Sequence, residues 1–562
     1  MKTPILLIED DELVLKTIQR LLAAKGYQVD IARNAIEALS RVAVADFDLV
    51  ISDIRMPGEN GIVAVEKIKH VFAERRVVCG FIFISGYAEE DTPAHAIRLG
   101  VDKFIHKPFD NEHFLKAIED ELLVVKEEQA LKIPPTLTPQ ISVKKAKMEG
   151  VGRKRVVITG IGAVAPNGIG KDAYWDGLTK GKNAVDFITF FDASNFPAKV
   201  AAEIPNFDPK LFINDPHEIK RMGRSAHLAV AGGKLALEDA GIMMPIKSDQ
   251  SVDVMVGSAT SGIDYAEPEI RALERGGVRK VRPFAGIAAF GGAISGEVSR
   301  AVGANGLSLT FSNGCTSGTD AIGYALKQIR YGLSEVVIAG GADACVTSAI
   351  VAAFCQMGAI STRNDKTASR PFNKDRDGFV IAEGSWMFVL EELEHALKRN
   401  AKIYGELMGY GATCDAWHMS KPHPSGEYTA QAIQLALADG GIQPEEVDVF
   451  EAYGNATPVN DSYETAVVKK VFGPHARKMV VPSVKSMLGH PIGAAGGQQL
   501  AAALLALNKG FIHPTINYEI PDPECDLDCV PNTGRHGNFK VAICNSLAFG
   551  GKNAAIVIRR FE

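Results

Sequence analysis

The chain has 562 residues, of which 46% are hydrophobic and 23% are charged, and its formal net charge is -6. Such a length predicts about three or four folding units with ample core, and the charge balance excludes a strongly basic nucleic-acid-binding protein. No run approaches the ~20 apolar residues of a membrane span, and the N-terminus shows no secretory signal pattern. The eight cysteines are scattered. We therefore expect a cytoplasmic protein without a disulfide framework.

Residues 1–122 alternate short apolar segments with amphipathic ones, which predicts a parallel sheet covered by helices on both faces. The clearest strands are residues 5–8, 49–52 and 80–85. Each is closed or followed by a polar or acidic residue. The ends of parallel strands form the binding crevice of an open α/β sheet, so we expect these groups to converge there. Their oxygens suit Mg²⁺ and a phosphoryl group, and Lys107 can supply a neutralising ammonium group.

This pattern resembles the receiver domain of two-component response regulators, a flavodoxin-like (βα)5 fold. The resemblance implies that Asp53 is the phosphoacceptor and that a sensor histidine kinase is a partner. The Mg²⁺ ligands that it implies are Glu9, Asp10, Asp53 and the backbone carbonyl of Arg55. The phosphoryl contacts that it implies are Ser85 and Lys107, with Phe104 as the switch aromatic. Two alternatives stay open: acids that only decorate loop ends, and a receiver that is never phosphorylated.

A linker is predicted between residues 123 and 152. A helix over residues 111–131 continues beyond the compact domain, and the proline-rich residues 133–140 favour an extended, semi-rigid spacer. Basic residues follow up to position 155. We interpret them as a solvated face, with a nucleic-acid site as the alternative.

Residues 155–165 predict a strand followed by a GxGxxA pattern. Such a pattern could open a dinucleotide site, but Pro166 would interrupt the helix that should receive the pyrophosphate. Further strands are predicted at residues 252–258, 336–344 and 386–390, separated by helices rich in glycine and alanine.

A candidate nucleophile lies in the segment Asn313-Gly314-Cys315-Thr316-Ser317-Gly318, after the apolar residues 307–311. The glycines predict a sharp turn from strand to helix, with Cys315 at the elbow. A helix N-terminus favours the thiolate form of a cysteine. The alternative is a buried structural cysteine, because unpaired cysteines pack well in cores.

Two turn-rich segments later in the chain, residues 451–458 and 484–491, accompany this cysteine. Together the three resemble the active-site segments of the β-ketoacyl-acyl carrier protein synthases, in particular the elongating, FabF-like group. The resemblance implies an α/β thiolase fold of five layers, with halves at residues 153–402 and 403–562, and a dimer. It also implies acyl carrier protein as a partner, which brings the phosphopantetheine arm, and no further cofactor for condensation.

The resemblance assigns roles residue by residue. Cys315 would accept the acyl chain as a thioester, and His490 would hydrogen-bond the carbonyl of the malonyl extender. Lys485 and Glu383 would form a buried charged pair, and the amides of Cys315 and Phe549 would form the oxyanion hole.

Further contacts follow from the same resemblance. Ser420, Asn455 and Thr457 correspond to positions along the pantetheine tunnel. A basic rim that would meet the acidic carrier protein consists of Lys220, Arg221, Arg224, Arg279, Lys280 and Arg363. Scattered surface charge is the alternative for these six residues.

The chain departs from the family pattern at one site. Tyr453 stands where the family has its first catalytic histidine, and a phenol with a reference pKa of about 10 is a poor base at neutral pH. Asn455 replaces a threonine, and Leu547 and Ala548 replace Phe-Gly in the gate segment. Decarboxylation of malonyl could therefore slow or depend on His490 alone.

Three functions remain open. The first is a specialised ketosynthase of fatty acid or polyketide synthesis, controlled or located by its receiver domain. The second is a non-condensing partner that binds acyl chains or sets chain length beside another ketosynthase, as a heterodimer. The third is a signalling protein in which the ketosynthase-like part senses lipid.

Overall fold

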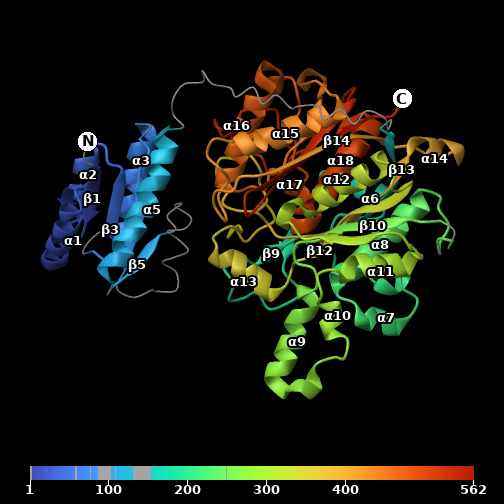
Figure 1. Cartoon of the computed structure of the whole chain (residues 1–562), viewed down its shortest axis with the longest axis horizontal. Coiled ribbons are helices and arrows are strands. Elements are labelled where there is room, and N and C mark those ends of the chain that lie inside the picture. The colour runs from blue at the N-terminus through green and yellow to red at the C-terminus, as the bar shows by residue number, and fades with distance from the viewer. Residues whose placement is uncertain are drawn as a thin grey trace. The chain divides into compact units, whose positions relative to one another are not determined.

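The computed structural model describes residues 3–56, 60–75, 77–85, 103–107, 109–130, 153–247 and 250–562. They belong to two compact units that divide near residue 146. We call residues 3–130 the first unit and residues 153–562 the second unit, and each is described by itself (Figure 1). The proline-rich part of the predicted linker lies outside the described residues.

The first unit is built on a five-stranded parallel sheet in the order β2-β1-β3-β4-β5. Its strands are β1 Pro4–Ile8, β2 Gln28–Ala32, β3 Leu49–Asp53, β4 Gly80–Ser85 and β5 Phe104–His106. Its described helices are α1 Glu12–Ala24, α2 Ala35–Val42, α3 Gly61–Glu74 and α5 Asn111–Ala130. The Asp11 side chain caps α1 and the Asn34 side chain caps α2, which satisfies amides that would otherwise lack partners.

Apolar residues on both faces of this sheet hold the helices. Leu15 of α1 and Phe114 of α5 pack with Ile51 on one face. Ala38 of α2 and Ile68 of α3 pack in a second cluster on the other. The predicted receiver-like fold is confirmed.

The second unit contains a ten-stranded sheet with the order β11-β10-β12-β13-β6-β14-β19-β18-β15, with β7 Gly168–Ile169 paired to β6. The strands are β6 Val156–Ala165, β10 Asp253–Gly257, β11 Ser308–Phe311, β12 Val336–Ala344, β13 Glu383–Glu392, β14 Gly405–Cys414, β15 Val449–Glu451, β18 Val541–Ala548 and β19 Lys552–Arg559. Strands β6 and β14 pair only at Gly405↔Ile158 and Glu406↔Val157. This short junction divides the sheet into two halves.

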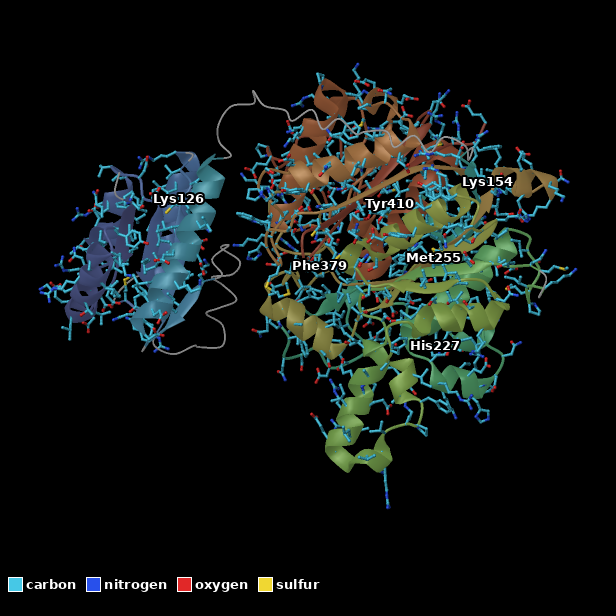
Figure 2. The ribbon with its side chains drawn as sticks, in the orientation of Figure 1. Lys126, Lys154, His227, Met255, Phe379 and Tyr410 are labelled. Atoms are coloured by element: carbon cyan, nitrogen blue, oxygen red, sulfur yellow. The ribbon has the colours of Figure 1, made fainter. Side chains whose placement is uncertain are left out.

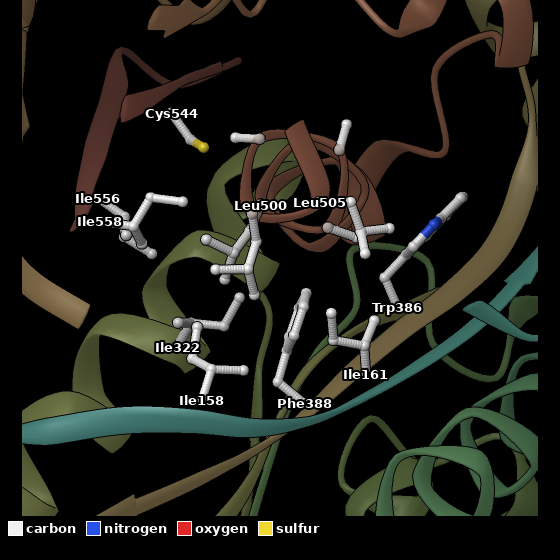
Figure 3. Packing of buried hydrophobic residues seen from close by; sticks show 14 of the residues in the cluster. Ile158, Ile161, Ile322, Trp386, Phe388, Leu500, Leu505, Cys544, Ile556 and Ile558 are labelled. Atoms are coloured by element: carbon white, nitrogen blue, oxygen red, sulfur yellow. The ribbon is translucent and has the colours of Figure 1, made fainter. Parts of the chain in front are cut away.

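Helices cover and separate the two halves in five layers (Figure 1). Helices α8 Arg224–Asp239 and α11 Ala293–Val302 pack outside the first half, and α15 Glu427–Gly440 and α16 Pro458–Phe472 outside the second. Between the halves lie α12 Ser317–Arg330 and α18 Ala495–Lys509. Every residue from 495 to 507 is buried, as expected of a helix enclosed on all sides. In Figure 3, Leu500 and Leu505 of α18 face the strand residues Phe388 and Ile161.

The GxGxxA segment lies inside strand β6 and opens no helix. Gly162 allows α8 to approach closely, because a Cβ there would lie 1.9 Å from the carbonyl oxygen of Gly232. The glycines therefore serve strand-to-helix packing, and the dinucleotide alternative is wrong.

The remaining α-helices in the described part of the second unit are α6 Lys171–Thr179, α7 Pro216–Arg221, α9 Ile263–Gly276, α10 Ala285–Ala288, α13 Ser348–Gln356, α14 Leu393–Lys398 and α17 Lys485–Leu488. Figure 2 shows Met255 of β10 and Tyr410 of β14, both of which are buried in the second unit. No helix in the described part of the chain has both the length and the apolar character needed to cross a bilayer.

Candidate active site

Cys315 lies at the predicted elbow between strand β11 and helix α12. Gly314 has a φ of 68°, which glycine adopts without steric cost, so the chain can turn sharply there. The hydroxyl of Ser317 donates to the Gly314 carbonyl at 2.6 Å. Asp320 accepts hydrogen bonds from Asn313 at 2.8 Å and from Thr316 at 3.0 Å. These bonds fix the position of the thiol.

The structure brings Cys315 together with three predicted catalytic side chains from other segments. The Nε2 atom of His490 lies 3.2 Å from the Cys315 Sγ atom and 3.1 Å from the Tyr453 hydroxyl. The Nζ atom of Lys485 lies 4.8 Å from the centre of the Tyr453 ring. All four residues are at most 4% exposed. The site is therefore a dry cluster with a thiol, an imidazole, a phenol and an ammonium group.

Burial dominates the ionisation of this cluster. It raises the pKa of the Cys315 thiol to about 11, although a hydrogen bond from Tyr453 and the charge of Lys485 both act to lower it. Burial and the nearby Lys485 charge hold the pKa of His490 well below its usual value. Burial and the neighbouring Cys315 raise the pKa of Tyr453 well above its usual range. Imidazole is therefore neutral at pH 7 and can accept a proton, whereas Tyr453 is a hydrogen-bond donor.

The predicted pair between Lys485 and Glu383 is wrong. Glu383 receives two hydrogen bonds from the guanidinium of Arg224, at 2.6 and 2.7 Å, and a third from the Ile204 amide. A guanidinium fits a carboxylate with two parallel bonds, which one ammonium group cannot match. In the described part of the chain, no group accepts a hydrogen bond from the Lys485 Nζ atom.

Glu464 is a site residue that the sequence reasoning missed. Its carboxylate accepts hydrogen bonds from the amides of Tyr453 and Gly454, at 2.8 and 2.9 Å, and from Asn545 at 2.6 Å. Burial raises its pKa to about 7. Burial lowers the pKa of Lys485 to about 8, and the charge of Glu464 is the strongest influence that opposes this shift. The sequence signal for Glu464 was an acidic residue about two turns into the helix that follows the Tyr453 segment, on the buried side of that helix.

A surface pocket leads to Tyr453. Its walls include Ser420, Lys421, Leu547 and Phe549. Ser420 and Phe549 line this pocket together with Tyr453, and the contact of Ser420 with a pantetheine arm stays a prediction.

Asn455 and Thr457 do not line this pocket among the residues that the structure describes. The Thr457 hydroxyl instead donates to the Asn455 side-chain oxygen at 2.8 Å and also accepts from the Asn460 amide at the start of α16. Their direct contact with a pantetheine arm stays a prediction.

The gate segment packs against the elbow. A Cβ on Gly314 would lie 3.3 Å from the Ala548 Cβ atom and 4.0 Å from the Phe549 carbonyl oxygen. The Phe549 ring, 37% exposed, lies 6.4 Å from Phe354, measured between ring centres. Phe354 lies 5.1 Å from Phe379, which lies 5.3 Å from His490. An aromatic row therefore runs from the surface to the imidazole.

The predicted basic rim is only partly a set of exposed charges. Four of its residues are exposed: Lys220, Arg221, Arg279 and Lys280. Arg224 is paired with Glu383, whose carboxylate neutralises its charge. Arg224 therefore does not belong to an exposed rim. Arg363 pairs with Asp375 at 2.6 Å.

In the first unit, the predicted acidic residues converge at the ends of β1 and β3. Carboxylate oxygens of Glu9, Asp10 and Asp53 all lie within 4.8 Å of one another. The Lys107 Nζ atom lies 2.7 Å from Glu9 and 2.6 Å from Asp53. Burial raises the pKa of Glu9, and the charge of Asp53 adds to this shift, while Lys107 opposes it.

A set of hard oxygen donors fits Mg²⁺, so this cluster fits the predicted metal. The amide of Arg55 donates to Asp53 at 3.1 Å, and the role of its carbonyl stays a prediction. The side chains of Ser85 and Phe104 lie outside those that the structure describes.

Comparisons with known proteins agree with both units. Residues 153–396 match the family model of the β-ketoacyl synthase N-terminal domain, and residues 404–519 match that of the C-terminal domain. Residues 5–119 match the response regulator receiver domain.

Relatives of known name are similar over the second unit. The chain is 40% identical over 417 residues to a 3-oxoacyl-[acyl-carrier-protein] synthase 2 of Synechocystis sp., covering 74% of this chain and 100% of that protein. It is 41% identical to the Coxiella burnetii protein of the same name, covering 73% and 99%.

Solved structures give the same result. The ishigamide ketosynthase/chain length factor is 35% identical, with a TM-score of 0.67, over 73% of this chain and 100% of that chain. A ketosynthase complex with its acyl-carrier protein, AntDE:AntF, is 31% identical, with a TM-score of 0.68 and the same coverage.

Proposed function

The chain belongs to the β-ketoacyl synthase family and carries a response regulator receiver domain at residues 5–119, and from this premise we propose that it is a condensing enzyme controlled or located by phosphorylation. The substrates are an acyl chain and a malonyl extender, each carried as a thioester on acyl carrier protein. The products are a β-ketoacyl carrier thioester and carbon dioxide. The pathway is a specialised fatty acid or polyketide synthesis in the cytoplasm.

Acyl transfer begins at Cys315. The neutral His490 imidazole, 3.2 Å from the sulfur, takes the thiol proton while the sulfur attacks the carbonyl carbon of the acyl carrier thioester. The carrier thiol leaves with that proton. The amides of Cys315 and Phe549 stabilise the oxyanion.

Condensation is a second step with other donors, which are the Tyr453 hydroxyl and the His490 imidazole in its Nε2–H tautomer. The carbonyl oxygen of the malonyl thioester accepts hydrogen bonds from His490 and Tyr453, which stabilise the enolate formed when carbon dioxide leaves. The enolate carbon attacks the Cys315 thioester, and the cysteine sulfur departs as the leaving group. Because Tyr453 donates but does not accept protons at neutral pH, His490 carries out all proton transfer in this scheme.

Partners of the second unit are inferred from its surface. The exposed residues Arg279 and Lys280 attract the acidic carrier protein and raise the encounter rate. Leu309 in edge strand β11 is 40% exposed and Leu307, just before that strand, is 42% exposed, which favours pairing with a second ketosynthase chain, identical or different.

The first unit accepts phosphate on Asp53 from a sensor histidine kinase. Glu9, Asp10, Asp53 and the Arg55 carbonyl would hold Mg²⁺, which would supply neutralising charge for the phosphoryl oxygens. Lys107 then pairs with the phosphoryl group, as it now pairs with Asp53. Ser85 and Phe104 complete the switch, by which the new charge draws a hydroxyl-bearing loop inward.

The contact between Cys315 and His490 carries the proposal. It is tested by single-turnover assays with a labelled acyl carrier protein, followed by malonyl carrier protein. We expect label on the enzyme first and a β-ketoacyl product second. Wild-type enzyme that takes up no label would overturn the proposed enzymatic function.

One observation favours a second function. Tyr453 is a buried phenol with a raised pKa, so the usual second imidazole is missing from the decarboxylation site. A chain of this kind could acquire acyl groups and set chain length beside another ketosynthase without condensing. Acylation followed by no product with any extender would favour it. A lipid-sensing signalling role would instead leave Cys315 without transferred acyl groups.

A further inference from the structure

A second buried acid–histidine pair lies directly behind the cluster and has no part in the mechanism above. Glu451 is the last residue of strand β15, two positions before Tyr453, and His513 follows strand β16 Phe511–Ile512. Both side chains are completely buried. Their Oε2 and Nε2 atoms are 3.1 Å apart.

The Glu451 carboxylate joins two segments of the active site. Its Oε1 atom accepts a hydrogen bond from the amide of Val484, at 3.2 Å, and Val484 immediately precedes Lys485. Its backbone carbonyl accepts from Gln499 of the central helix α18 at 3.0 Å. One side chain thus ties the end of strand β15, two positions before Tyr453, to the turn that carries Lys485.

His513 faces an acceptor at each ring nitrogen. Its Nδ1 atom lies 3.2 Å from the Pro514 carbonyl oxygen, and its Nε2 atom faces Glu451. A neutral imidazole has only one N–H, so the protonated form satisfies both contacts better. Burial lowers the pKa of His513, but the Glu451 charge and these hydrogen bonds outweigh it and raise the pKa above its usual value.

A nearby carboxylate such as that of Glu451 matters for Lys485, because the ammonium group is buried without a hydrogen-bond acceptor among the described residues. The charged and titratable groups around it come from several elements: Glu464 and Asp461 of α16, Glu451 of β15, Cys315 of the elbow, Cys544 of β18, and the active-site residues Tyr453 and His490. The Glu464 carboxylate already accepts hydrogen bonds from two amides and from the Asn545 side chain. Glu451 is the next strongest acid in its effect on Lys485.

We propose that Glu451 and His513 are positioning residues: Glu451 fixes the Lys485 turn and keeps the ammonium group charged beside Cys315, and His513 orients the Glu451 carboxylate and limits its charge. This inference rests on the proposed function and deepens it. The ammonium charge favours the Cys315 thiolate, so the pair acts on the nucleophile through Lys485. Glu451 itself is not among the strongest influences on Cys315.

The test measures the rate at which iodoacetamide alkylates Cys315 as a function of pH, with the modified peptide quantified by mass spectrometry. In Glu451→Gln the amide oxygen can still accept from Val484, but the charge is lost. Lys485 then loses its proton at lower pH, and the thiolate is less favoured. We expect the alkylation rate at pH 8 to fall about threefold to tenfold, with the profile displaced to higher pH. Glu451→Asp should recover part of the loss.

His513→Gln separates this role from a purely structural one. Glutamine keeps a donor for Glu451 but removes the positive charge, so Glu451 acts more strongly on Lys485. The profile should then move to lower pH, opposite to Glu451→Gln. If Glu451→Gln fails to fold, the pH profile of His513→Gln still tests the proposal.

A matched control exists at the end of strand β13. Glu391 is also completely buried and faces a histidine, His395, at 2.7 Å. Glu391→Gln should lower the melting temperature and leave the Cys315 profile unchanged.

Two results would overturn the inference: a wild-type profile in Glu451→Gln, or equal slowing in both Glu451→Gln and His513→Gln. Failure of the proposed function looks different. There, the displaced profiles would appear as expected, while wild-type Cys315 accepts no acyl group from the carrier protein.

Discussion

Each unit has a lysine beside its nucleophile, but the two lysines differ in solvent exposure and in their hydrogen-bond partners. Lys107 is partly exposed and touches the carboxylates of Glu9 and Asp53 directly. Lys485 is buried, rests above the Tyr453 ring and makes no hydrogen bond within the described residues. A paired lysine holds its charge and can be drawn to an incoming phosphoryl group. A buried, unpaired lysine loses its proton near neutrality, so its effect on a thiol depends on pH.

The largest expected effect concerns the carboxylate nucleophile. Asp53→Asn should abolish labelling by a small phosphodonor with Mg²⁺, because the amide cannot attack phosphorus, while acyl transfer to Cys315 persists. Autoradiography or intact mass measurement would show it. Equal labelling of wild type and variant would remove Asp53 as the acceptor.

Restoring an imidazole at position 453 tests the phenol in the second unit. Tyr453→His should raise the rate of malonyl decarboxylation about 100-fold, since a second neutral imidazole adds acid–base capacity at the site. Released carbon dioxide is the readout. A folded variant whose rate is unchanged or lower would show that Tyr453 is no weakened substitute for histidine.

The charge on Lys485 should be visible in the reactivity of Cys315. Lys485→Met removes the cation that opposes the raised thiol pKa, so alkylation at pH 7 should slow about tenfold. The wild-type lysine has a pKa of about 8, and its support for the thiolate fades as pH rises through that value. The difference between wild type and variant should therefore shrink above pH 8. If the difference in alkylation rate between wild type and Lys485→Met stayed constant up to pH 10, the charge on Lys485 would be excluded as its cause.

The smallest effect is expected at the exposed rim. Replacing Arg279 and Lys280 together by alanine should raise KM for acyl carrier protein about threefold at low salt, with kcat unchanged, because exposed charges mainly speed encounter. Steady-state assays at two salt concentrations would show the difference closing at high salt. The double variant Lys220→Ala and Arg221→Ala removes the other two exposed charges of the rim, at the end of α7, and should be compared in the same assays. An increase that persists at high salt would contradict an electrostatic role.

The sequence predicted the fold well because its signals were local or followed a family pattern. The strands of the first unit and the Cys315 elbow follow from apolar periodicity and glycine placement. The contact of Cys315 with His490, 175 positions away, came from the family resemblance.

The pairing of buried charges was harder to predict. Glu383 was expected to pair with Lys485, yet it pairs with Arg224, because the identity of a buried partner depends on side-chain reach across layers. Glu451 opens the predicted segment 451–458, but nothing in its spacing indicates a contact with His513, which lies 62 positions further along the chain.

The role of Cys315 as the acyl acceptor is tested by peptide mass spectrometry after incubation with a panel of acyl carrier proteins, before and after malonyl carrier protein is added. We expect an acyl adduct on Cys315 that disappears as a β-ketoacyl product forms, and no adduct in Cys315→Ala. An adduct on another cysteine, or none on Cys315 with any acyl carrier, would contradict it.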